Sequence, residues 1–156
     1  MHDLDRIPAR PVPAEEGFLE RFRGCFTGIL RWEQLDRFWE VLRARAGDGW
    51  YVYAVGEAPP TAPVSAGKLL AFVDEIDPLL RREHGEDYCG LVYVDDLTVP
   101  TYIKIFDPHN LGVSCGYSDN PPLPGWIVSR IRPEDLGALT PPGGRRRWWQ
   151  RLFGSG

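Results

Sequence analysis

The chain has 156 residues, of which 43% are hydrophobic and 12% aromatic, so it carries enough apolar material for the core of one ordinary domain. Its uninterrupted apolar runs are short, which excludes a membrane-spanning helix of roughly 18 residues. The formal net charge is −4.

This charge is unevenly distributed. Four arginines lie between positions 145 and 151, in a C-terminal segment without acidic residues, and removing their charges from the total of −4 leaves −8 on the rest of the chain. Lysine occurs only at positions 68 and 104. A nucleic-acid-binding surface would show clustered lysine and arginine, so we expect no nucleic-acid partner.

The N-terminus and the cysteines favour the cytoplasm. Residues 1–13 hold charged residues among prolines and lack the apolar stretch of about 7–15 residues that marks a secretory signal. The three cysteines, at positions 25, 89 and 115, form no close pair and leave one unpaired in any disulfide scheme. We therefore expect a cytoplasmic protein, at the inner face of the membrane if its C-terminal segment binds lipid.

Two helices are predicted after an extended, proline-containing arm over residues 1–13. The spacing of apolar residues predicts a short helix over 15–23, followed by a break at 24–28. The clearest helix is predicted over 32–45, where apolar residues recur at i, i+3, i+4 and i+7 and a glycine follows the basic last turn. These apolar residues are Leu35, Phe38, Trp39 and Leu42.

A strand and a third helix follow. Residues 50–55 are aromatic and β-branched between two glycine-containing turns, which predicts a strand. Ser65 is a candidate N-cap for a helix that runs to about Arg82. We expect this helix to bend or restart near Pro78.

From residue 88 onward the pattern is mostly that of strands. Adjacent antiparallel strands are predicted over 88–95 and 101–106, a brief third strand over 111–116 and a final strand over 126–131. One helical turn is predicted at 133–136, where proline stands first.

This order predicts a single small α+β domain over residues 14–140, with the N-terminal helices packed on one face of a mostly antiparallel sheet. Residues 141–156 are predicted to be a Pro/Gly linker and a basic-aromatic tail.

The C-terminal tail interleaves cations with large apolar side chains. Such a segment can lie in a lipid interface, with its rings at the headgroup boundary and its arginines near anionic phosphates. It can also bind a groove on a partner protein, or fold back onto its own domain. The candidate membrane- or partner-binding residues are Arg145, Arg146, Arg147, Trp148, Trp149, Arg151, Leu152 and Phe153.

A second candidate site is the turn at 107–110 with a cysteine shortly after it. Asp107, His109 and Cys115 are all metal-ligand types, and Cys115 with His109 is a conceivable nucleophile–base pair. The spacing matches no strong signature, since the chain has neither Cys-x-x-Cys nor His-Glu-x-x-His. A turn whose polar side chains bond their own backbone accounts for the segment more simply, so we expect no cofactor and no catalytic set.

The leading hypothesis is therefore a non-enzymatic accessory protein, an adaptor or assembly factor. Its acidic body would bind a protein partner and its tail would dock on a membrane surface or on that partner. One alternative is a small metal-dependent or thiol-based enzyme that uses Asp107, His109 and Cys115. Another is an acidic inhibitor or immunity-like protein that neutralises a basic target.

Overall fold

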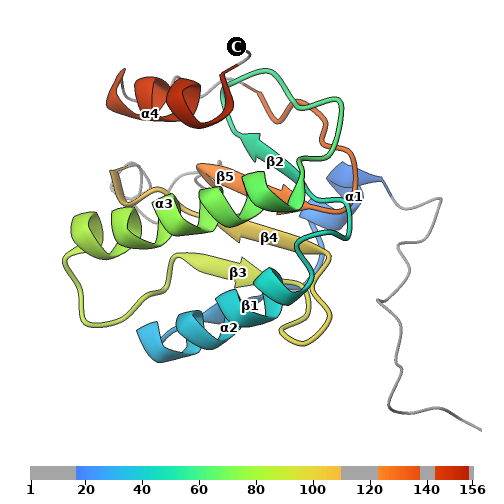
Figure 1. Cartoon of the computed structure of the whole chain (residues 1–156). Coiled ribbons are helices and arrows are strands. Elements are labelled where there is room, and N and C mark those ends of the chain that lie inside the picture. Colours follow the sequence, from blue (N-terminus) through green and yellow to red (C-terminus); the bar gives the residue numbers. More distant parts are fainter. Residues whose placement is uncertain (1–16, 110–122, 138–142, 155–156) are drawn as a thin grey trace, which may run out of the picture.

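Five short strands form one antiparallel sheet. The computed structural model describes residues 17–109, 123–137 and 143–154 (Figure 1). The strands lie in the order β1-β3-β4-β5-β2, and every neighbouring pair is antiparallel. They are β1 (Thr27–Ile29), β2 (Tyr51–Ala54), β3 (Val92–Val94), β4 (Tyr102–Ile105) and β5 (Trp126–Ser129). The predicted class, a single small α+β domain, is confirmed.

Two long helices cover one face of this sheet. Figure 1 shows α2 (Trp32–Ala44) and α3 (Ala66–His84) lying across it. Because side chains alternate along a strand, every second strand residue faces these helices. The main core joins their apolar stripes to this strand face, through residues that include Leu35, Leu42, Phe72, Ile76, Val52, Val92, Ile103 and Val128.

The opposite face has a smaller apolar layer. Helix α1 (Phe18–Phe22) contributes the buried Phe18, which packs among Tyr53, Tyr102 and Ile127. Arg21 of the same helix is also buried, and its Nη2 donates to Asp95 Oδ2 and to Thr101 Oγ1, each at 3.0 Å. The helices are thus divided between the two faces, with α1 opposite α2 and α3.

Helix α3 is a single element that passes through Pro78. Ser65 caps its start by accepting a hydrogen bond from the Lys68 backbone N–H, as predicted, and Gly85 ends it at a positive φ of 73°. The helix extends two residues beyond Arg82. We attribute its continuity to the buried Ile76, Leu79 and Leu80, whose packing on both sides of Pro78 offsets one missing backbone hydrogen bond.

Two local predictions were wrong. The segment predicted as a break contains most of β1, and residues 133–136 form no helical turn. The strand was missed because it has only three residues and a central glycine, which gives little periodicity to read. The strand predicted at 111–116 lies outside the described residues.

Gly28 of β1 makes room for an aromatic ring on the neighbouring strand. It pairs with Tyr93, and a Cβ at Gly28 would lie 2.7 Å from Tyr93 Cε2. The Tyr93 ring also contacts Phe106 edge to face, with 5.5 Å between ring centroids. Glycine is therefore required here by close approach, and the covering ring fixes β1 against β3.

Replacing Gly28 by alanine should lower the free energy of unfolding by about 1–3 kcal/mol, the usual cost of overpacking. Urea denaturation provides the measurement. Gly47→Ala is the matched control, because a Cβ there meets nothing within 4 Å. In a Tyr93→Ala background the Gly28→Ala penalty should largely disappear, and an undiminished penalty would contradict the proposed clash.

Candidate functional site

The C-terminal segment forms a helix, α4 (Gly143–Phe153), that lies on the domain beside α3 (Figure 1). Its aromatic rings surround Phe72 of α3, with centroid distances of 6.3 Å to Trp148, 6.5 Å to Trp149 and 6.1 Å to Phe153. Trp148 also meets Trp126 of β5 edge to face at 5.7 Å. The helix therefore extends the main core, as in the third arrangement expected for the tail.

Polar contacts hold the same helix to α3. Trp148 Nε1 donates to Glu75 Oε1 at 2.9 Å, and Arg151 Nη2 donates to the same oxygen at 3.0 Å. These hydrogen bonds, that from Arg151 first, lower the pKa of the Glu75 carboxyl. Lys68 Nζ donates to the Leu152 carbonyl at 2.9 Å, which satisfies an otherwise free acceptor in the last turn of α4.

Arg145 anchors the start of α4 between two carboxylates. Its Nε and Nη2 donate to Asp107 at 2.9 and 3.0 Å, while its Nη1 and Nη2 donate to Glu83 at 3.2 and 2.6 Å. The Arg145 side chain is only 11% exposed and that of Asp107 only 3%. Burial disfavours the guanidinium charge, but the hydrogen bonds to Asp107 and Glu83 outweigh it and raise the pKa of Arg145. Hydrogen bonding from Arg145 lowers the pKa of Glu83.

This ion-pair network also contains two residues of the predicted metal or thiol site. Both carboxylate oxygens of Asp107 accept hydrogen bonds from Arg145, and Oδ1 also accepts one from the His109 backbone N–H. His109 Nε2 contacts Glu83 Oε1. Cys115 lies outside the described residues. Within residues 17–109, 123–137 and 143–154, no three His, Cys, Asp or Glu side chains are placed to hold a metal ion. The described partners assign Asp107 to anchoring α4.

The outer surface of α4 presents arginines. Arg146, Arg147 and Arg151 are exposed, with Arg146 paired to Glu57 at 3.2 Å. Trp148, Trp149 and Phe153 pack against the core and are half-buried, so the arginines are the more exposed side chains of the docked helix. Membrane or partner binding by the tail stays a prediction. No helix in the described part of the chain has the length and apolar character needed to cross a membrane.

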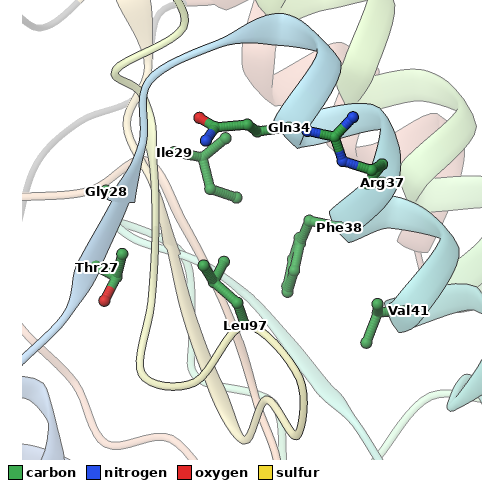
Figure 2. Close-up of a pocket in the computed structure, with 8 residues that line it drawn as sticks. All are labelled: Thr27, Gly28, Ile29, Gln34, Arg37, Phe38, Val41 and Leu97. Atoms are coloured by element: carbon green, nitrogen blue, oxygen red, sulfur yellow. The ribbon is translucent and has the colours of Figure 1, made fainter.

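A cavity of about 260 Å³ opens between β1 and α2 (Figure 2). Ile29 and Phe38 form its buried walls, and Leu97 from the β3–β4 loop, 44% exposed, projects into the space between strand and helix. Arg37 is the charged residue of the lining. The remaining lining residues are Thr27, Gly28, Gln34 and Val41. We call this space the β1–α2 groove.

The groove runs beside an open edge of the sheet. β1 pairs with β3 on one side, and no strand of the described chain pairs with it on the other. Leu30, immediately after β1, is 59% exposed. The sequence did not reveal this surface, because it did not reveal β1. The available signal was the group of apolar residues Phe26, Ile29 and Leu30 around Thr27 and Gly28.

Lys104 of β4 makes contacts that the sequence did not reveal. Its Nζ lies 4.1 Å from the Phe22 ring centroid and 4.0 Å from that of Phe26, and donates to the Phe22 carbonyl at 2.6 Å. Burial lowers the Lys104 pKa to about 8. Its contacts fasten the end of α1 to the sheet by cation–π attraction.

Trp148→Ala should lower the free energy of unfolding by about 2–3 kcal/mol, somewhat less than for a fully buried tryptophan, because the indole fills the space between Phe72 and Trp126. Arg147→Ala, which removes an exposed side chain of the same helix, should change it by less than about 0.5 kcal/mol. Urea unfolding of the full chain measures both. Equal, negligible effects would instead support a tail that reaches outward.

Arg145→Met should destabilise the protein by about 3 kcal/mol near neutral pH, because it leaves two poorly solvated carboxylates unpaired. Glu83 has a lowered folded-state pKa, so its contribution is present above the unfolded value of about 4.3 and is lost as the pH falls through the folded value. The difference between wild type and variant should therefore shrink below about pH 4.

Chemical denaturation at several pH values tests this dependence. The control is Arg151→Met, which removes an exposed ion pair and should cost no more than about 1 kcal/mol. A cost for Arg145→Met that is the same at pH 7 and pH 3 would contradict the assignment of an ionic anchor.

Comparisons with known proteins add no assignment to this geometry. Protein-family models, curated proteins and solved structures were searched, and none matches the chain. Function must therefore be argued from the two surfaces described above, the docked α4 and the β1–α2 groove.

Proposed function

We propose that the chain is a non-enzymatic accessory protein, an adaptor or assembly factor, whose protein partner binds in the β1–α2 groove. One observation carries the proposal: the outer edge of β1, with which no described strand pairs, lies directly beside a largely apolar cavity. Unpaired strand edges are templates for pairing with another chain, and apolar pockets beside them accept alternate side chains.

The size and lining of the groove favour a protein over a small ligand. Its volume of about 260 Å³ lies below the roughly 300–1,000 Å³ of typical small-molecule sites. Such a space suits one or two inserted side chains. Leu97 lines the cavity and is 44% exposed, so it carries the apolar surface of the cavity out to the exterior, as expected at the centre of a protein interface.

The enzymatic alternative receives less support from the described residues. Asp107 and His109 already have partners in the network around Arg145 and Glu83. A carboxylate that accepts two hydrogen bonds from one guanidinium is poorly placed to act as a base or as a metal ligand. The acidic-inhibitor alternative rests on the overall charge of the chain, and the groove, whose charged lining residue is Arg37, adds no support to it.

The tail has a different role in this proposal. Inserting the α4 rings into a membrane would first require their separation from Phe72 and Trp126, which is costly because it exposes apolar surface. We propose that α4 stays docked and that any contact with anionic lipid or with the partner uses Arg146, Arg147 and Arg151. Such contact would be weak and salt-sensitive.

Site-specific photo-crosslinking in cells tests the groove as the partner site. The photoreactive amino acid p-benzoylphenylalanine replaces Leu97 in the full chain, and we expect a discrete protein adduct. Adding Val41→Glu, which places a charge on the groove wall, should reduce that adduct at least about tenfold, as expected from desolvating an unpaired charge in an apolar interface.

The matched control carries the same photoreactive residue at the exposed Arg132, outside the groove. Thermal melting of each variant establishes that it is folded. The proposal fails if Leu97 gives no adduct, if the adduct survives Val41→Glu, or if position 132 gives the same adduct.

A further inference from the structure

We infer that the bound part of the partner is an extended internal segment that pairs with β1 as an added strand and places an acidic side chain against Arg37. This inference rests on the proposed function and specifies the chemistry of its partner. It commits to one occupant, a strand-forming segment with apolar residues and a carboxylate at a fixed spacing.

Successive side chains of β1 point to opposite faces of the sheet. Thr27 and Ile29 share the face turned toward α2, and both line the groove. An added strand would follow the same pleat, so every second side chain of the bound segment would also point toward α2. Those side chains would meet the apolar wall of Phe38, Val41 and Leu97 (Figure 2).

Arg37 is the charged side chain of the groove. It is exposed on α2, lines the groove, and has no ion-pair partner among the residues that the structure describes. Glu33 and Glu40 lie one helical turn to either side of it but form no part of the groove lining. The groove therefore combines apolar walls with one cation, and a single carboxylate is the complementary group.

The overall negative charge of the chain distinguishes an acidic preference caused by Arg37 from a general electrostatic effect. The chain outside the C-terminal arginines has a formal charge of −8, which by itself attracts basic segments. A preference for an acidic residue must then arise locally, from Arg37. Selection of basic segments would instead report the overall charge.

An internal segment fits better than a chain terminus. Cys25 and Leu30, which flank β1, are both exposed, and no described strand pairs with the outer side of β1. A bound strand can therefore continue past both ends of β1. The groove lining contains no carboxylate that could bind a free amino terminus.

The test selects phage-displayed random 12-residue peptides on the full chain, on Arg37→Glu and on Val41→Glu. We expect wild-type selection to enrich peptides with Asp or Glu at a fixed distance from an apolar residue. Arg37→Glu should abolish or invert the acidic preference, and Val41→Glu should abolish the enrichment. Arg37 is exposed and Val41 is half-buried on α2, and thermal melting checks the folding of both variants.

An enriched peptide, synthesised with both ends blocked, then reports the binding mode. Exchanging its acidic residue for the corresponding amide should weaken binding about 2–5-fold, the range of an exposed ion pair. This loss should be absent in Arg37→Gln. Amide hydrogen exchange should show new protection within residues 27–29, and N-methylation of alternate peptide amides should remove binding by blocking the strand pairing.

The outcomes separate this inference from the proposed function. Groove-dependent peptides without an acidic preference, or bound without protection of β1, overturn the inference and leave the groove as a partner site. Failure to enrich any groove-dependent peptide also overturns it, while the Leu97 crosslink decides the proposed function independently. An acidic preference that survives Arg37→Glu contradicts the role given to Arg37.

Discussion

The structure depends on burying both faces of a small five-stranded sheet. Alternate strand residues face the core under α2 and α3, and the others face the layer that contains Phe18, Tyr53 and Tyr102. With both faces occupied, new contacts can form mainly at the edges. At the β2 edge, Val64 already donates a backbone hydrogen bond to the Trp50 carbonyl. At the β1 edge, no described strand makes a comparable contact, and this edge is the one to which the proposed partner site belongs.

Because α4 packs against the domain, the basic C-terminal segment is part of the fold. Arg145 is held between Asp107 and Glu83 in a poorly solvated position, where charge pairing is stronger than in water. The aromatic rings of α4 continue the main core around Phe72. The arginines therefore partly neutralise an acidic body, and the same segment that resembles a membrane anchor in the sequence acts as a structural element of the fold.

Local sequence patterns predicted the elements with strong periodicity. The apolar stripe from Leu35 to Leu42 identified α2, and the cap at Ser65 identified the start of α3. β1 was missed because three residues around Gly28 provide almost no period, and its stability comes from pairing with β3 and from the Tyr93 ring. The edge and the groove could not be predicted without it.

Long-range contacts explain what the sequence left open. Arg145 meets Asp107 across 38 positions and Glu83 across 62, and no local spacing encodes those encounters. A segment that combines arginines with tryptophans is equally compatible with a lipid surface, a partner groove and the chain's own core. The choice among them depends on whether Phe72 and Trp126 present a complementary apolar surface, which is a property of the assembled sheet.

The most direct test of the account is amide hydrogen exchange of the full chain, alone and bound to the purified partner that crosslinks from Leu97. The account predicts new protection concentrated in residues 27–30 of the β1 edge and 34–41 of α2, with α4 unchanged. Protection confined to residues 143–154, or loss of protection there, would show that the partner uses the C-terminal helix and would contradict the groove as the functional surface.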